Sequence, residues 1–169
     1  MVWHQSNRAD PLVRAVADRH YNRQKPGTPQ FVPPGRCCVL YAANARGKAI
    51  WVTSFPFAEY VKHQWAGAWI CSAFRNEGAG IASTMIREAV AATRAYFGEP
   101  PELGMITFIN TKKVRPTKCH GMDTWGYTYK KAGFQLVGKT KKGLLAFQLL
   151  PKDMPMPEAA LPSLSKEVG

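Results

Sequence analysis

The chain has 169 residues, a length typical of one domain, and 46% of them are hydrophobic, which is enough to bury a core. Its 23 lysines and arginines outnumber 11 aspartates and glutamates, giving a formal net charge of +12 at pH 7. This excess excludes an acidic surface and indicates an anionic partner: nucleic acid, a membrane face or a phosphorylated cofactor. Since no apolar run approaches the roughly 20 residues that span a bilayer and the first residues lack a signal-peptide core, we expect a soluble, cytoplasmic protein without a membrane partner.

The cysteines predict neither disulfides nor a metal site. The four are Cys37, Cys38, Cys71 and Cys119, and none forms a Cys-x-x-Cys pair. A disulfide framework is not expected at this length in a reducing compartment. Although His120 follows Cys119, adjacent ligands lack the usual zinc spacing, so we expect no bound metal.

The first half of the chain predicts a short helix, a loop and three strands. Apolar residues at helical spacing predict a helix over residues 11–21, with Asp10 as its N-cap. Four prolines and two glycines predict a rigid loop over residues 25–35, and long loops of this kind often line sites. Three β-rich runs predict strands, the first two joined as a hairpin: residues 37–42, 49–53 and 68–74.

The second half begins with a long amphipathic helix. Residues 81–97 carry a continuous apolar stripe at 3.6-residue spacing, ended by Gly98 and two prolines. The run 103–109 predicts a buried central strand, and residues 110–124 are polar and basic. The remaining predicted elements are a short helix over residues 125–132, strands over 134–137 and 144–150, and a proline-rich, disordered tail over 151–169. This order predicts a mixed α/β domain around one sheet.

The segment Arg75–Gly80, between a predicted strand and the long helix, has the composition of a phosphate-binding loop. Gly78 and Gly80 let the backbone approach a ligand closely. The N–H groups of the first helical turn point into the same space, where the helix dipole adds positive potential. Arg75 can supply a further cation at the mouth. The segment therefore predicts a pyrophosphate site.

Two common phosphate motifs fit this segment poorly. A Walker loop would end in Gly-Lys-Ser/Thr, which is absent. A dinucleotide-binding loop would have a third glycine where Ser83 stands and an acidic residue where Asn110 follows the next strand. What distinguishes the chain is a combination: Arg-x-x-Gly-x-Gly between strand and helix, and Tyr-Lys-Lys-Ala-Gly-Phe over residues 129–134 downstream.

With this combination the chain resembles, over about residues 10–150, the GNAT superfamily of acyl-CoA-dependent N-acyltransferases. Their phosphate loop has the form Arg/Gln-x-x-Gly-x-Gly/Ala, and their last helix often carries Tyr-x-Lys-x-Gly-Phe. The resemblance implies one GNAT-like domain over residues 1–150, of mixed α/β (α+β) class, with a mostly antiparallel sheet flanked by helices. It also implies acetyl-CoA or a related acyl-CoA as the donor.

The resemblance further implies roles for individual residues. Tyr129 would protonate the leaving thiolate, the strand 70–74 would lie along the pantetheine, and Asn110 would contact the cofactor arm. The residues implied to bind the donor are Cys71, Ala73, Phe74, Arg75, Asn76, Gly78, Ala79, Gly80, Ser83 and Asn110. Apart from the resemblance, a tyrosine on a short helix is more often packing, and an asparagine at a strand end is as often a turn former.

Longer stretches resemble a narrower family, the phage DNA-modification proteins of the Mom type. These stretches are residues 19–35, 61–80, 97–110 and 128–151. The resemblance implies an enzyme that modifies the exocyclic N6 amine of adenine in DNA with a carbamoylmethyl-type group, which blocks host restriction nucleases. It also implies the cytoplasm of a host cell as the location.

The basic residues permit a DNA partner. Lys112, Lys113, Arg115 and Lys118 are predicted to form a DNA-binding loop, and residues 139–142 a second basic turn, although such loops are often only solvated surface. Because an N6 amine cannot reach a buried thioester from inside double-stranded DNA, base flipping is required. The tryptophans at positions 51, 65, 69 and 125 are candidates to stack on the extruded base or to fill the core.

The chemistry requires a general base, because the conjugated adenine amine is a poor nucleophile. The candidates are Asp123, which is alternatively an N-cap of the short helix, and His20, at the edge of the proline-rich loop. A carbamoylmethyl product is an alkylated amine, so a single acetyl transfer would not make it. Two alternatives stay open: a GNAT enzyme acting on another amine, and a non-catalytic DNA-binding module that retains the fold.

Overall fold

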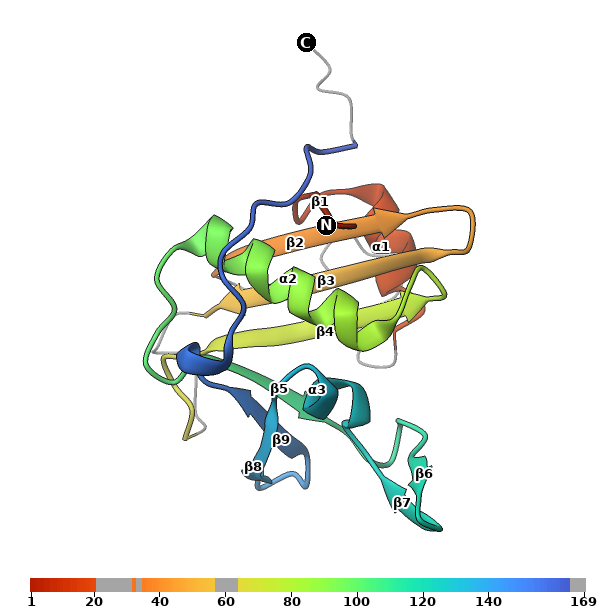
Figure 1. Cartoon of the computed structure of the whole chain (residues 1–169), viewed down its shortest axis with the longest axis vertical. Helices are drawn as coiled ribbons and strands as arrows, with labels where there is room; N and C mark the ends of the chain where they lie inside the picture. Colours follow the sequence, from red (N-terminus) through yellow and green to blue (C-terminus); the bar gives the residue numbers. More distant parts are fainter. Residues whose placement is uncertain (21–31, 33–34, 57–63, 165–169) are drawn as a thin grey trace.

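The computed structural model describes residues 1–20, 32, 35–56 and 64–164, and shows a seven-stranded sheet with helices on both faces (Figure 1). The strand order is β1-β2-β3-β4-β5-β9-β8; β4 and β5 run parallel, and all other neighbours are antiparallel. The predicted fold class, a single mixed α/β domain with a mostly antiparallel sheet, is thereby confirmed.

The strands are β1 (His4–Gln5), β2 (Arg36–Ala43), β3 (Lys48–Phe55), β4 (Trp69–Glu77), β5 (Met105–Ile109), β6 (Thr117–Cys119), β7 (Met122–Thr124), β8 (Gln135–Lys139) and β9 (Leu145–Leu149). The helices are α1 (Pro11–Ala17), α2 (Ala82–Phe97), α3 (Tyr127–Lys131) and the 3-10 turn η2 (Pro151–Asp153). Strands β6 and β7 form a separate two-stranded sheet.

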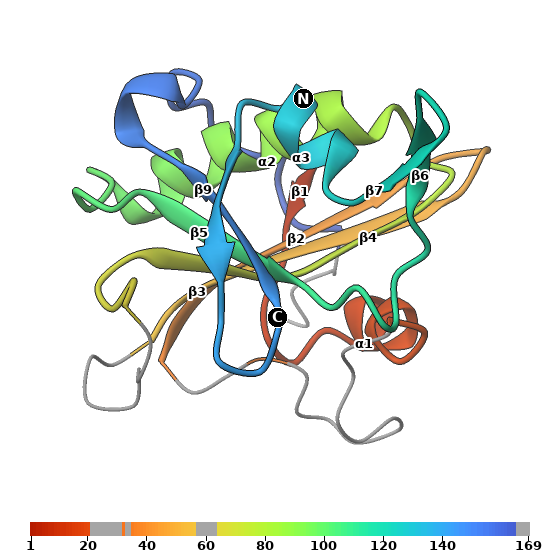
Figure 2. The same ribbon diagram turned by 90° about the horizontal axis from the view of Figure 1, so that it is seen from below.

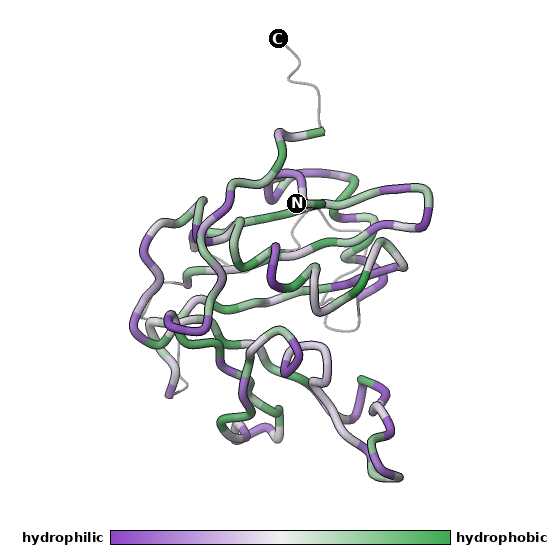
Figure 3. The backbone as a smooth tube through the Cα atoms, viewed as in Figure 1, coloured by the Kyte–Doolittle hydropathy of each residue, from purple (hydrophilic) through white to green (hydrophobic). Residues whose placement is uncertain are grey.

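Side-chain alternation along the strands builds a core on each face of the sheet. From β2, Cys38 and Leu40 pack in the layer that contains α2, whereas Val39 and Tyr41 pack in the layer that contains α1. Figure 2 shows α2 and α3 on one face and α1 on the other. In Figure 3 hydrophobic residues follow the central strands and hydrophilic residues gather in the connecting turns. The central strands are therefore buried from both sides, whereas the edge strand β8 is largely exposed.

Most predicted elements are present with shifted ends. The long helix is α2, whose stripe of buried residues includes Met85, Ile86, Ala89 and Val90. The helix predicted over residues 11–21 stops at Ala17, and its N-cap Asp10 accepts a hydrogen bond from the Leu12 amide as expected. The sequence did not predict β1, the β6–β7 hairpin or the 3-10 turn η2. Most of the proline-rich segment 25–35 lies outside the described residues.

The prediction of a disordered tail is wrong for residues 151–164. Met154 is buried in the core, and the Arg94 guanidinium donates a hydrogen bond to the Pro155 carbonyl at 2.8 Å. The Leu161 amide donates to the Trp3 carbonyl at 2.8 Å, so the segment crosses α2 and reaches β1. Burial of Met154 and these hydrogen bonds outweigh the local proline-rich composition. Residues 165–169 lie outside the described part.

Candidate functional site

Strands β4 and β5 form a fork at the centre of the sheet. They pair at three positions, Trp69 with Met105, Ile70 with Ile106 and Cys71 with Thr107. The Thr107 hydroxyl donates to the Cys71 carbonyl at 3.2 Å at the last of these positions. Beyond it, β4 continues along β3 to Glu77, while β5 continues along β9 to Ile109. Two parallel strands that separate in this way leave room for a ligand between them.

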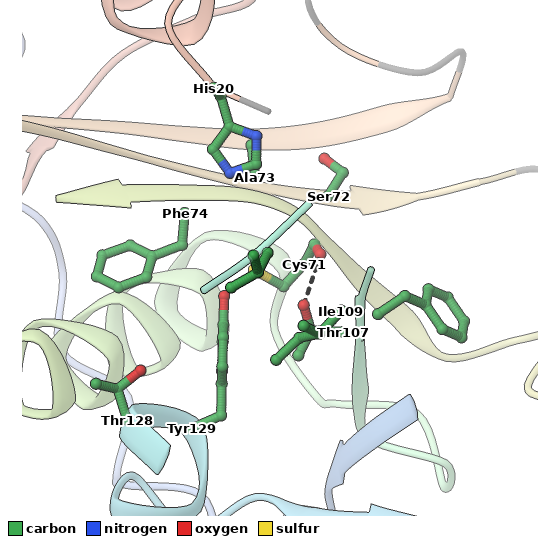
Figure 4. A pocket seen from close by; sticks show the side chains of 11 residues that line it. His20, Cys71, Ser72, Ala73, Phe74, Thr107, Ile109, Thr128 and Tyr129 are labelled. Atoms are coloured by element: carbon green, nitrogen blue, oxygen red, sulfur yellow. Dashed lines mark hydrogen bonds between the residues drawn. The ribbon is translucent and has the colours of Figure 1, made fainter. Parts of the chain in front are cut away.

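A cavity of about 190 Å³ occupies the fork. Its lining includes His20, which follows α1 on one face of the sheet, and Tyr129, which comes from α3 on the other face (Figure 4). The rest of its wall comes from β4, β5 and the segments that follow β5 and precede Tyr129: Cys71, Ser72, Ala73, Phe74, Thr107, Phe108, Ile109, Val114 and Thr128. The cavity therefore brings together residues that sequence analysis proposed separately.

Tyr129 is held by aromatic packing, with its hydroxyl directed into the fork. Its ring meets Phe74 and Phe134 edge to face, with centroid distances of 6.4 Å and 5.4 Å. In Figure 4 the hydroxyl points toward Cys71 and away from α3. The short helix α3 thus presents the Tyr129 hydroxyl to the cavity on a ring that is fixed by its aromatic neighbours.

Cys71 is a neutral, buried thiol rather than a nucleophile. Desolvation raises its pKa to about 12, although hydrogen bonds with Thr107 and Tyr129 act in the opposite direction. It was predicted to line the pantetheine path, and it does line the cavity, together with Ala73 and Phe74. Cys71 therefore lines the cavity next to the Tyr129 hydroxyl as a small, polarisable side chain.

The predicted phosphate loop forms a tight turn that is held by asparagine side chains. Asn76 accepts a hydrogen bond from the Ala79 amide at 2.9 Å and donates to the Gly80 carbonyl at 2.8 Å. Asn44, from the β2–β3 turn, donates to the Ala79 carbonyl at 2.7 Å. Gly78 has φ +86°, a conformation that favours glycine. The Ala79 amide, implied to bind pyrophosphate, instead bonds within the turn.

Helix α2 begins directly after this turn without a polar cap. Its N-cap residue is Ile81, whose apolar side chain is 72% exposed and cannot accept a hydrogen bond. Ser83 lies half-buried in the first turn. A Cβ added at Gly80 would lie 3.2 Å from the Met85 sulfur, a flexible neighbour that can move. The first-turn amides of a 16-residue helix therefore open beside the loop with the dipole behind them.

Arg75 does not stand alone at the mouth of the loop. Its guanidinium donates to the Glu77 carboxylate at 2.7 Å, and Arg19 binds the same carboxylate at 2.6 Å. The pKa of Glu77 falls to about 2, chiefly because of the hydrogen bond from Arg19. Arg75 was expected to supply a further cation at the mouth; instead two arginines surround one carboxylate, which leaves one net positive charge beside the loop.

Asn110 forms a turn, as the simpler interpretation expected. Its side-chain oxygen accepts a hydrogen bond from the Lys112 amide at 3.0 Å, and its carbonyl accepts from the Lys113 and Val114 amides. This turn carries the chain from β5 to Val114, which lines the cavity. The side-chain oxygen of Asn110 is therefore used within the protein.

Asp123 does not fit the role of general base. It lies exposed on β7, and its carboxylate binds Lys118 across the hairpin at 2.5 Å. It does not line the cavity, and the N-cap of α3 is Gly126 instead. Of the two candidate bases, the fold brings only His20 to the cavity.

The predicted DNA-binding residues and the tryptophans differ in their exposure to solvent. Lys112, Lys113, Arg115 and Lys118 are all exposed, as a DNA-binding loop requires. Trp51, Trp65 and Trp69 are at most 6% exposed, so they fill the core and cannot stack on a base. Trp125 is half-buried, and its indole N–H donates to the Val114 carbonyl at 2.9 Å. None of the four therefore presents an open stacking surface.

Three polar cavity residues were not singled out from the sequence: Ser72, Thr107 and Thr128. Thr107 is the one polar residue in the apolar run 103–109, which is a signal of a special role in a buried strand. Ser72 and Thr128 carry no comparable signal, because isolated hydroxyl residues are common in strands and short helices.

Comparisons with known proteins return no relative. No protein-family model matches the chain, no curated protein matches it, and no solved structure matches it. Among the described residues, no three histidine, cysteine or acidic side chains gather as a metal site would need, and no helix there has the length and apolar character to cross a bilayer.

Proposed function

We propose that the chain is an acyl-CoA-dependent transferase of the GNAT type that acts on the N6 amine of adenine in DNA, as Mom-type proteins do. One observation carries the proposal: His20 and the Tyr129 hydroxyl reach one cavity from opposite faces of the sheet, where β4 and β5 separate. An acid and a base on opposite sides of a slot suit a reaction in which donor and acceptor enter from different faces.

The residues around the fork fit an acyl-CoA. The edge of β4 beyond Cys71 turns away from β5 and offers backbone groups along a cavity wall of Ala73 and Phe74. The uncapped first turn of α2 suits a pyrophosphate. The Glu77 carboxylate would repel a phosphate, but its two arginine partners neutralise it. Gly78 and Gly80 would allow close approach of the backbone.

In this proposal the side chains handle protons. A bound acyl-CoA would supply an electrophilic carbon and a thiolate leaving group. The Tyr129 O–H would donate a proton to the leaving sulfur, and the imidazole of His20 would accept the proton lost from the attacking amine. The packing of Tyr129 on Phe74 and Phe134 fixes its ring and thereby the position of its hydroxyl.

The acceptor is proposed to be DNA because positive charge is concentrated in the part of the chain that supplies much of the cavity wall. Residues 105–150 hold nine of the 23 lysines and arginines and one of the 11 acidic residues. All nine basic side chains are exposed. Such a concentration of positive charge attracts phosphate backbones and raises local DNA concentration at moderate salt. The adenine itself would have to leave the base stack to enter the fork.

The test is nucleoside mass spectrometry on DNA from cells that express the wild-type chain. The proposal expects a deoxyadenosine of altered mass that is absent from cells with empty vector. The mass also distinguishes an N6-amide, the direct product of acyl transfer, from a carbamoylmethyl amine. An unaltered nucleoside profile, together with acyl transfer to a small amine or a protein by the purified enzyme, would assign the same site to another acceptor.

A further inference from the structure

The β6–β7 hairpin extends from the domain as a separate ribbon (Figures 1 and 2). The strands are three residues each, and all six residues are exposed except the half-buried Thr124. An isolated two-stranded hairpin of this length gains little stability of its own. A short ribbon that contributes nothing to the core is consistent with a role in binding a partner.

The ribbon is nevertheless built to be stiff. Its two-residue turn, His120 and Gly121, has φ values of +50° and +79°, as a tight type I′ turn requires. Below the turn, Lys118 and Asp123 form their ion pair across the strands. At the root, the Thr124 hydroxyl donates to the Thr117 carbonyl at 2.9 Å. The two strands are thus held together from the turn to the root, where the ribbon joins the domain.

That place is next to the candidate site. Trp125, the residue after β7, donates its indole N–H to the carbonyl of Val114, and Val114 lines the cavity. The segment between these two residues, which includes the whole hairpin, therefore leaves from and returns to the cavity rim. A partner that this hairpin enters would therefore lie near the fork.

The tip combines an apolar side chain with basic surroundings. Met122, paired with Cys119 beside the turn, is 68% exposed, the most exposed large apolar residue between Gly98 and Pro151 of the described chain. The exposed Arg115 precedes the hairpin, and Lys130 and Lys131 follow it. A partner must therefore be strongly anionic outside and must accept a single apolar side chain inside. Duplex DNA has both properties, with phosphates outside and stacked bases within.

We propose that the β6–β7 hairpin is the wedge that opens the DNA, with Met122 entering the base stack in the space that the target adenine leaves. Apolar side chains inserted between base steps are known to unstack and kink DNA, and methionine is among the residues that do so. The inference rests on the proposed function, because it supplies the step that delivers adenine to the fork. A paired adenine needs this step, whereas an adenine in single-stranded DNA does not.

The experiment compares Met122→Ala with Met156→Ala, a matched control at a methionine that is 80% exposed in the C-terminal segment. Modification rates are measured by nucleoside mass spectrometry on one sequence, supplied as duplex and as single strand. Met122→Ala is expected to slow modification of the duplex about tenfold or more, since unstacking costs a few kcal/mol. On the single strand it is expected to stay within about twofold of the wild type. Met156→Ala is expected to match the wild type on both.

Three results would overturn the wedge. Equal loss on duplex and single strand would mean that Met122 supports the site or the fold, and an unchanged duplex rate would mean that it does nothing. Met122-dependent binding to vesicles of anionic lipid, with no binding to duplex DNA, would assign the tip to a membrane. A different outcome, a wild-type chain that modifies no adenine in either substrate, would refute the proposed function itself and the wedge with it.

Discussion

Arg19 and Glu77 form a two-point ion pair that joins the end of α1 to the end of β4. Arg19 Nε lies 2.7 Å from Glu77 Oε2, and Arg19 Nη2 lies 2.6 Å from Glu77 Oε1. Arg19 directly precedes His20, and Glu77 directly precedes Gly78. The pair therefore holds the proposed base and the proposed phosphate loop in a fixed relation, although they are distant in sequence.

Replacing Glu77 by glutamine should lower stability in a pH-dependent manner. Since folding lowers the carboxyl pKa from 4.5 to about 2, the stabilisation is fully present above pH 4.5 and is lost as the pH falls toward 2. Partial exposure screens the pair, so we expect a difference of about 1–2 kcal/mol at pH 7. Urea unfolding at pH 7 and pH 3 measures it. Glu102→Gln, at an exposed position, serves as control, and a difference that persists undiminished at low pH would contradict the assignment.

Replacing Tyr129 by phenylalanine should remove activity without unfolding the domain. The ring contacts with Phe74 and Phe134 would remain, and only the proton donor would be removed. We expect the modification rate to fall on the order of 10²-fold or more, with an unchanged thermal midpoint. Tyr127→Phe, on the same helix but 49% exposed, should retain the wild-type rate. A modification rate equal to that of the wild type would mean that another group protonates the leaving thiolate, and it would remove Tyr129 from the role of proton donor.

Replacing His20 by asparagine should likewise slow the reaction on the order of 10²-fold, because the proton acceptor is removed. His20 lines the cavity on the α1 side and, in the proposal, accepts the proton of the amine without binding the donor, so the affinity for acyl-CoA should not change. His4→Asn is the control, since His4 lies on β1, outside the cavity, where its ring Nδ1 forms a hydrogen bond with the Pro162 carbonyl. Rates are compared at saturating donor. If His20→Asn weakened donor binding and left the rate unchanged, His20 would belong to the donor site instead.

Two substitutions of Gly80 should distinguish the effect of added volume on CoA affinity from the effect of added negative charge. Gly80→Ala adds a Cβ that meets only the flexible Met85 side chain and should keep its CoA affinity within severalfold. Gly80→Asp adds a carboxylate beside the first turn of α2, where it would repel the pyrophosphate and abolish detectable binding. Calorimetry measures both affinities, and circular dichroism verifies folding. Undiminished CoA binding by the aspartate variant would remove the loop from the donor site.

Removing the charges of Lys112, Lys113 and Arg115 should weaken DNA binding and flatten its dependence on salt. For every phosphate that the protein no longer neutralises, the slope of log affinity against log salt falls by about 0.9. We therefore expect the slope of the triple alanine variant to fall by up to about three such units, measured by fluorescence anisotropy. A variant with Lys112 and Lys113 changed to arginine and Arg115 to lysine keeps the charges and should keep the slope. Equal slopes for the alanine variant and the wild type would place the DNA elsewhere.

The sequence predicted those helices and strands whose hydrophobic pattern lies entirely within the element. The apolar stripe of α2 can be buried only if the segment is a helix, and the continuous apolar run of β5 fits a central strand. Both elements are therefore present as predicted, with starts shifted by one and two residues. The hairpin β6–β7 has a weaker local signal, because its strands are three residues long and its turn is His-Gly rather than Asn-Gly. The tail was mispredicted because its contacts with Trp3 and Arg94 are distant in sequence.

The sequence by itself determined the fold class, the long helix with its preceding glycine turn and the concentration of positive charge, because each depends on composition or on short-range spacing. Only the tertiary structure decided that β4 and β5 separate after Cys71, that His20 and Tyr129 share one cavity, and that Asp123 faces Lys118 instead. These relations follow from strand register and from packing between layers. Such non-local contacts leave no periodic trace in the residues that make them.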